Sequence, residues 1–98
     1  KVLENIVYNN LRVLDYSVNI GKLEDKEIDF VAQKNNQKIY IQVAYMIKDE
    51  ETHSKEFGNL LKINDNWRKL VVSVDELPGN PYKGIEHWNI RDFLMRFE

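Results

Sequence analysis

The chain of 98 residues contains no cysteine, and this absence removes several kinds of chemistry together. A disulfide framework, a thiolate zinc site, an iron–sulfur cluster and a cysteine nucleophile all require that residue. Glycine is also scarce, and the four glycines at positions 21, 58, 79 and 84 do not have the spacing of a phosphate-binding loop. The chain therefore contains no P-loop nucleotide site.

A charge excess and long apolar runs are missing as well. The 14 basic and 16 acidic residues leave a net charge of -2, so the chain has no bulk attraction for nucleic acid or anionic membranes. No segment approaches the roughly 20 apolar residues that cross a bilayer, and no signal peptide opens the chain. We expect a cytoplasmic domain with no membrane partner. Because the first residue is Lys1 and not Met, we expect it to be part of a longer protein.

What the chain does contain is enough apolar residues, 43%, for one hydrophobic core. A chain this short rarely divides into two cores, so we predict a single domain over residues 1–98. Apolar residues at three- and four-residue spacings predict an amphipathic helix over residues 2–14. Asp49 as an N-cap predicts a second helix that ends near Ile63, and residues 90–97 predict a third.

Alternating apolar and polar residues predict the strands. A short strand is expected at 18–20, followed by a charged turn at 22–26, and further strands at 70–74 and 85–88. The clearest signal is a β-hairpin of residues 28–32 and 39–45, joined by Asn35-Asn36, because asparagine tolerates the positive φ of a two-residue turn. We therefore predict an α/β fold with a mixed sheet flanked by helices, in the order helix, three strands, helix, strand, short strand, helix.

The hairpin turn also predicts a register. If Asn35 and Asn36 form the turn, Phe30 lies opposite Ile41 and Asp29 lies opposite Gln42. One face of the hairpin is then apolar, and the other is polar; the apolar set is Ile28, Phe30, Ile41 and Val43, and the polar set is Glu27, Asp29, Tyr40, Gln42 and Ala44. An Asp, an amide opposite it and a Glu from the first helix, Glu4, could hold a hard divalent cation. A plain solvated sheet face would carry similar residues, so spacing alone leaves both readings open.

At these residues the sequence resembles the PD-(D/E)xK nucleases, which have a restriction-endonuclease-like fold. The resemblance is carried by Glu4 in the first helix, by Glu27-Ile28-Asp29-Phe30, and by Tyr40-Ile41-Gln42-Val43-Ala44-Tyr45. It implies that Glu4, Asp29 and Gln42 occupy the metal-binding and catalytic positions. Gln42 stands where active members have Glu, and Ala44 stands where they have the catalytic Lys. Relocated lysines occur in this superfamily, and the candidates here are Lys26, Lys48 and Lys55.

Four blocks in the same order are similar to the C-terminal domain of unknown function of prokaryotic AAA-type ATPases. The blocks are residues 25–32, 39–45, 56–63 and 84–94. The resemblance implies an upstream ATPase domain in the same polypeptide. With Gln42 and Ala44 at the chemical positions, we expect an accessory or interaction domain with a degenerate nuclease fold and no catalysis of its own. The alternative is a Mg²⁺-dependent DNA endonuclease, or a Holliday-junction-resolvase-like enzyme, that uses Glu4, Asp29 and Gln42. A DNA contact and a homodimer both remain open.

Other residues give weaker signals. His53 and His87 lack the spacing of a zinc-ligand pair, and the serines at 17, 54 and 73 lack the context of a hydrolase nucleophile. Trp67, Arg68 and Lys69 form the one cluster of basic and aromatic residues. This cluster predicts either a nucleic-acid or partner contact or an ordinary junction between a loop and a strand.

Overall fold

The computed structural model describes residues 1–23 and 26–98. Its elements are α1 (Val2–Val13), β1 (Ser17–Leu23), β2 (Lys26–Lys34), β3 (Gln37–Val43), α2 (Glu50–Leu61), β4 (Arg68–Ser73), β5 (Glu86–Asn89) and α3 (Ile90–Arg96). The predicted order of elements is confirmed. β1 and β2 are longer than predicted, because strand replaces most of the expected charged turn. Residues 24 and 25 of that turn lie outside the described residues.

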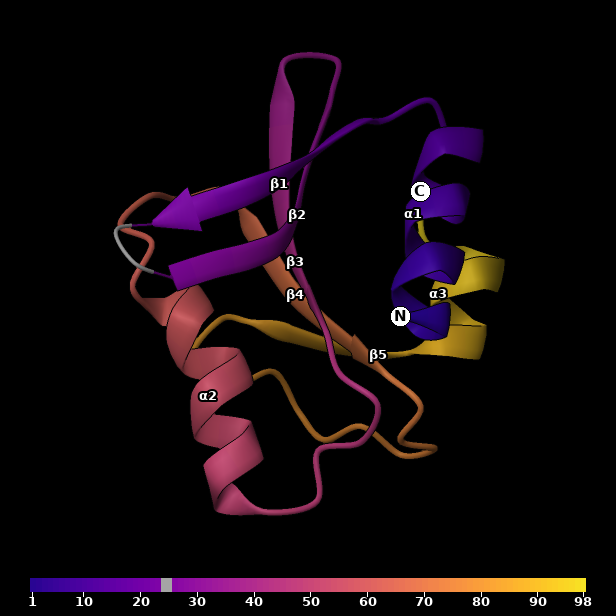
Figure 1. The fold of residues 1–98 in the computed structure, drawn as a ribbon. Helices are drawn as coiled ribbons and strands as arrows, with labels where there is room; N and C mark the ends of the chain where they lie inside the picture. The colour runs from indigo at the N-terminus through magenta and orange to yellow at the C-terminus, as the bar shows by residue number, and fades with distance from the viewer. Residues whose placement is uncertain (24–25) are drawn as a thin grey trace.

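The five strands form one mixed sheet in the order β1-β2-β3-β4-β5. The pairs β1–β2 and β2–β3 are antiparallel, whereas β3–β4 and β4–β5 are parallel. Figure 1 shows α1 and α3 side by side against one face of this sheet and α2 against the other. None of the helices described is long and apolar enough to span a bilayer.

A separate hydrophobic core lies on each face of the sheet. Under α1 and α3, the buried residues include Val7, Leu11, Ile41, Val72 and Phe93. Under α2, they are Ile28, Phe57, Leu60, Val71 and Ile85. Successive residues of a strand point to opposite faces of the sheet. Ile41 and Val72 therefore belong to the core under α1 and α3, and Val71 belongs to the core under α2.

The hairpin between β2 and β3 has the predicted turn and register. Asn35 and Asn36 both have positive φ, 54° and 63°, which is the backbone conformation of a type I′ turn. From that turn, the backbone ladder runs from Lys34 opposite Gln37 to Phe30 opposite Ile41. The ladder ends there, one pair before the expected pairing of Asp29 with Gln42.

A β-bulge in β2 corrects the predicted faces of the hairpin. Asn19 pairs with Val31 and Gly21 pairs with Ile28, so Asp29 and Phe30 lie together opposite the single residue Ile20. An extra residue in one strand reverses the alternation of side chains beyond it. Phe30 therefore packs against the core under α1 and α3, whereas Ile28 is buried in the core under α2. The prediction that Ile28 and Phe30 share one apolar face is wrong.

Candidate functional site

The candidate site lies where β2 separates from β3, next to the bulge. The backbone N–H of Asp29 donates a 2.7 Å hydrogen bond to Oε1 of Gln42. In the other direction, the backbone N–H of Val43 donates a 2.8 Å bond to Oδ2 of Asp29. Each side chain therefore accepts a hydrogen bond from the opposite strand in place of a backbone carbonyl. The predicted neighbours Asp29 and Gln42 are brought together, but through their side chains.

Gln42 is a buried polar residue, only 4% exposed. Its Oε1 satisfies Asp29, and its Nε2 donates to Oε1 of Glu56 at 3.4 Å. A buried amide requires such partners, because an unpaired buried polar group costs about 1–3 kcal/mol. Asp29, Gln42 and Glu56 thus form one connected polar cluster between β2, β3 and α2.

Glu56 is a member of this cluster that the sequence reasoning did not identify. Residues four apart lie one above the other on a helix, so Glu56 shares the face of Leu60, which is completely buried against the sheet. The same periodicity that identified the helix could have predicted that Glu56 points toward the strands.

The carboxyl groups of the cluster lie close enough to repel one another. Burial raises the pKa of Asp29 above its ordinary value, and the charges of Glu4 and Glu27 raise it further. The hydrogen bond from Val43 and the charge of Lys55 act in the opposite direction. Burial also raises the pKa of Glu56, with a contribution from Asp29 and, again, an opposing one from Lys55. The site therefore carries excess negative charge that its own hydrogen bonds do not fully neutralise.

The remaining predicted site residues occupy different surroundings. Glu4, on α1, contributes to the electrostatics of Asp29, but it makes no hydrogen bond to the cluster within the described residues. Ala44, at the position of the expected catalytic lysine, is buried, and its backbone N–H donates to the carbonyl of Val72 at 3.0 Å.

The three lysines proposed as replacements also differ from one another. Lys55, on α2, is an exposed residue whose charge acts on both Asp29 and Glu56. Lys48 is exposed on the connection before α2, and it is not among the groups that shift either carboxyl. The side chain of Lys26 lies outside the described residues.

Two of the three predicted metal ligands, Asp29 and Gln42, are engaged in hydrogen bonds within the fold. Magnesium requires near-octahedral coordination by oxygen atoms, usually with one or two carboxylates. In this cluster, Oε1 of Gln42 and Oδ2 of Asp29 each already accept a backbone hydrogen bond. Among residues 1–23 and 26–98, no three His, Cys, Asp or Glu side chains are arranged to hold a metal ion.

The basic and aromatic cluster at Trp67 is largely neutralised. Arg68 forms a two-pronged ion pair with Glu86, at 2.6 and 2.8 Å, and Nζ of Lys69 lies 2.8 Å from Oδ1 of Asp65. Trp67 itself remains 42% exposed. The prediction of a loop-to-strand junction describes Arg68 and Lys69 well, since both lie at the start of β4 and pair with neighbouring acids.

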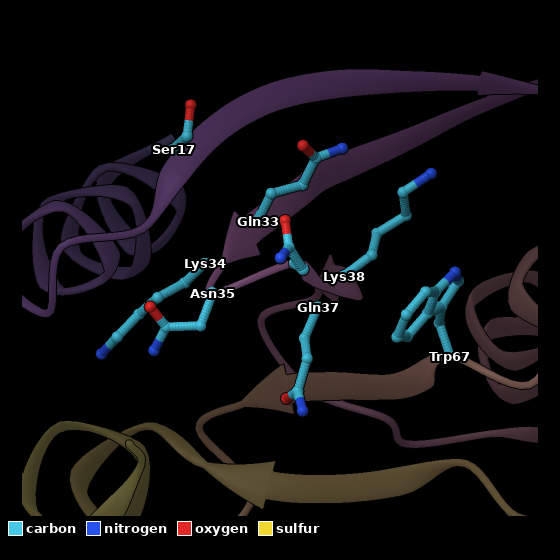
Figure 2. A pocket seen from close by; sticks show the side chains of 8 residues that line it. Ser17, Gln33, Lys34, Asn35, Gln37, Lys38 and Trp67 are labelled. Atoms are coloured by element: carbon cyan, nitrogen blue, oxygen red, sulfur yellow. The ribbon is translucent and has the colours of Figure 1, made fainter.

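Trp67 also borders a polar cleft of about 410 Å³ at the end of the β2–β3 hairpin. Figure 2 shows the side chain of Lys38 and the ring of Trp67 on the same side of this cleft, with the side chain of Lys34 extending away from them. Nζ of Lys34 donates to the carbonyl of Leu14 at 2.7 Å, which accounts for its direction. Lys38 and Trp67 therefore border the same cleft, with Nζ of Lys38 5.9 Å from the ring centroid of Tyr40.

Comparison with known proteins identifies one relative. The chain is 43% identical over 94 residues to an uncharacterized protein of Haemophilus influenzae. The match covers 96% of this chain but only 23% of the relative, so the chain spans about a quarter of the length of the protein it resembles. No protein-family model matches the sequence.

Proposed function

We propose that this chain is an accessory or interaction domain of a prokaryotic AAA-type ATPase, with a restriction-endonuclease-like fold and a degenerate nuclease site. The arrangement of elements supports the fold assignment. A helix that carries Glu4, an antiparallel unit of β1, β2 and β3, and a crossover through α2 to the parallel strand β4 follow the order that the resemblance implies.

One observation carries the functional part of the proposal. The polar groups of Asp29 and Gln42 are used to hold β2 and β3 together where their backbones no longer pair. A side chain that satisfies a buried backbone N–H has a structural role, and displacing it would cost about 1–3 kcal/mol. At the lysine position, Ala44 offers no charge to position or activate a water molecule. This site supports a scaffold better than a catalyst.

The association with an ATPase is supported by sequence and by length. Four blocks of this chain resemble the domain that follows the nucleotide-binding core in those ATPases. The Haemophilus influenzae relative extends far beyond the matched 94 residues, which leaves room for such a core. Deleting the matched segment from that relative should leave a protein that binds ATP. A remainder that shows no ATP binding would contradict this part of the proposal.

A metal and nuclease assay tests the degenerate site. We expect the purified chain to leave supercoiled plasmid and four-way-junction DNA intact at millimolar Mg²⁺ or Mn²⁺, and its melting temperature to be unchanged by either ion. The control is Asp29→Asn under the same conditions. Metal-dependent cleavage that disappears in Asp29→Asn would overturn the proposal and establish the nuclease alternative.

A variant designed to restore metal binding gives a second test of the degenerate site. Gln42→Glu replaces an amide with a carboxylate beside Asp29 and Glu56, so it should destabilise the domain in the absence of metal. Adding Mg²⁺ should then raise the melting temperature of this variant, because a ligand that binds only the folded state stabilises it. Gln37→Glu, at the exposed start of β3, is the matched control and should show neither effect. Equal behaviour of the two variants would show that the position of Gln42 is not the former ligand position.

The nuclease alternative is favoured by one feature, the charge of Lys55 beside Asp29 and Glu56. A lysine close to two carboxylates is the combination that the resemblance places at an active site. If the chain does cleave DNA, Lys55→Ala should lower the rate by about 10²–10⁴, as expected for loss of a general base or an electrostatic stabiliser. Cleavage that survives in Lys55→Ala would assign the activity to a different site or to a contaminant.

A further inference from the structure

A second polar cluster lies at the carboxyl end of β4 and the first half of β5, on the face of the sheet that α2 covers. Ser73 is the last residue of β4, Asp75 follows two residues later, and His87 lies on the neighbouring strand β5. Oγ of Ser73 is 2.6 Å from Oδ2 of Asp75 and 2.7 Å from Nε2 of His87. The sequence predicted no site here, because the parallel pairing of β4 and β5 is what brings these residues together.

The hydrogen bonds assign the protons of this cluster. An ionised carboxylate only accepts, so the hydroxyl of Ser73 donates to Asp75, which also accepts from the backbone N–H of Ile47 at 2.9 Å. The oxygen of Ser73 then accepts from Nε2–H of His87. In a neutral imidazole the other nitrogen, Nδ1, is an acceptor. Oδ1 of Asp75 and Nδ1 of His87 have no hydrogen-bond partner within residues 1–23 and 26–98.

These two residues line a cavity of about 220 Å³ together with aromatic side chains. The ring of His53 stacks on Phe57 at 4.3 Å between centroids, and Tyr82 meets His53 edge-on at 4.5 Å. The side chain of His87 is only 9% exposed and that of Asp75 only 20%. No lysine or arginine is found among the described residues that line the cavity. The cavity thus combines aromatic rings with one carboxylate, whose Oδ2 is held by Ile47 and Ser73 and whose Oδ1 is left without a partner among the described residues.

We propose that this cavity binds a guanidinium group, in the form of an arginine side chain of a partner protein. A guanidinium is planar, always charged and carries several N–H donors, so it can donate to the unpaired Oδ1 of Asp75 and balance its charge. The aromatic rings of His53 and Phe57, which also line the cavity, can add attraction to a cation. The volume lies below the roughly 300–1,000 Å³ typical of small-molecule sites, so it suits one side chain better than a nucleotide.

This inference does not depend on the nuclease resemblance. The guanidinium cavity shares no residue with the cluster of Asp29, Gln42 and Glu56, and it would act equally in a catalytic or a non-catalytic domain. It gives an interaction domain a defined point of contact with its partner, which is a side chain inserted beside β4 and β5 on the face that α2 covers.

The test compares ligands that differ only in the guanidinium. Agmatine and N-carbamoylputrescine have the same length and the same terminal ammonium, but the second carries a neutral ureido group in place of the guanidinium. In an NMR titration of the purified chain, we expect agmatine to give saturable shifts of the His53 and His87 ring signals. N-carbamoylputrescine should bind at least tenfold more weakly. Equal affinities, or no shift with agmatine, would overturn the proposal.

A peptide ligand distinguishes an arginine side chain of a protein from a free guanidino compound. A tripeptide Gly-Arg-Gly blocked at both ends should bind with an affinity within tenfold of that of agmatine, whereas Gly-Lys-Gly should not saturate the site. Binding of agmatine without binding of the arginine peptide would contradict the assignment to a protein side chain and point to a free guanidino compound.

Variants connect the binding to the cavity. Asp75→Asn retains an acceptor for Ile47 and Ser73 but removes the charge, so we expect affinity for agmatine to fall at least tenfold. If Asp75→Asn fails to fold, Tyr82→Leu removes one aromatic wall from a loop and should weaken binding several-fold. Tyr8→Leu, on α1 at the opposite face, is the matched control and should bind as the unaltered chain does. An unchanged affinity in Tyr82→Leu would place the ligand elsewhere.

Discussion

The backbone N–H of Asp29 donates its hydrogen bond to the side chain of Gln42, at 2.7 Å, at the point where a regular antiparallel ladder would pair two backbones. The bulge in β2 leaves this N–H without a strand partner, and Gln42 supplies one from across the gap. This arrangement joins the two residues at the centre of the candidate site to the stability of the fold, and it leads to predictions that do not depend on any activity.

Replacing the acceptor should expose its structural role. Gln42→Met preserves the volume but leaves the N–H of Asp29 unpaired in a buried position, so we expect a loss of about 1–3 kcal/mol in the free energy of unfolding, measured by urea denaturation. Gln37→Met, at the exposed start of β3, is the control and should change stability by no more than about 0.5 kcal/mol. Similar stabilities for the two variants would mean that another group satisfies Asp29.

The raised pKa of Asp29 predicts how stability depends on pH. A carboxyl whose pKa is higher in the folded state contributes stability that is present below its unfolded pKa and is lost as pH rises through the folded value. Asp29→Asn removes this loss, and the amide oxygen can still accept from Val43. We expect the variant to melt a few degrees higher than the unaltered chain at pH 7, because Asn has no charge to be buried or to be repelled by Glu4 and Glu27.

The difference between Asp29→Asn and the unaltered chain should shrink as the pH falls through the folded pKa of Asp29, and it should disappear near pH 2, about two units below the ordinary pKa of aspartate, where the carboxyl is protonated in both states. The measurement is a series of thermal melts between those pH values. A variant that is less stable at pH 7 would indicate that the charge of Asp29 is neutralised in the folded protein.

His87 predicts the opposite dependence on pH. Burial lowers the pKa of His87, and His53 acts in the same direction, while Asp75 opposes them. When the pKa of a histidine is lower in the folded than in the unfolded state, the stability of the folded protein falls as the pH drops from the unfolded value of about 6.5 through the folded value. An NMR titration should therefore show His87 titrating below pH 6.5. A midpoint above 6.5 would mean that the attraction of Asp75 outweighs burial.

Two glycine substitutions, one beside the bulge and one in α2, should have contrasting effects on stability. A Cβ on Gly21 would lie 2.5 Å from Cγ2 of Val31 and 3.1 Å from Cβ of Ile28, so Gly21→Ala should cost about 1–3 kcal/mol. Gly58, in the middle of α2, has open space around it, and Gly58→Ala should stabilise by about 0.5–1 kcal/mol. Chemical denaturation of both variants provides the comparison, and a neutral Gly21→Ala would show that β1 and β2 separate easily at the bulge.

The sequence predicts those parts of the fold that depend on local patterns. The Asn35-Asn36 turn determines the hairpin register, and Asp49 begins α2 through its side-chain bond to the N–H of Thr52, at 2.8 Å. The bulge at Asp29 and Phe30 was not predictable in this way, because it follows from how β1 packs on β2 and leaves no change in the alternation of residue types. The wrong placement of Ile28 has this cause.

The candidate site was predictable only in part for the same reason. Asp29 and Gln42 followed from the hairpin register, but Glu56 joins them through the packing of α2 on the sheet. Ser73, Asp75 and His87 meet because two parallel strands lie side by side, and that pairing closes a loop of more than ten residues. Contacts between residues distant in sequence have no local signature that a single sequence would reveal.

The division of the sheet into an antiparallel and a parallel half also has a consequence for the order of folding. The β2–β3 hairpin closes through a two-residue turn, and such hairpins form in about 1–10 μs. The parallel pairs β3–β4 and β4–β5 must first close much longer loops, and this slows them. We therefore expect the link between Asp29 and Gln42 to form early in folding, before α2 brings in Glu56. The guanidinium cavity, built on β4 and β5, would be the last part of the domain to assemble.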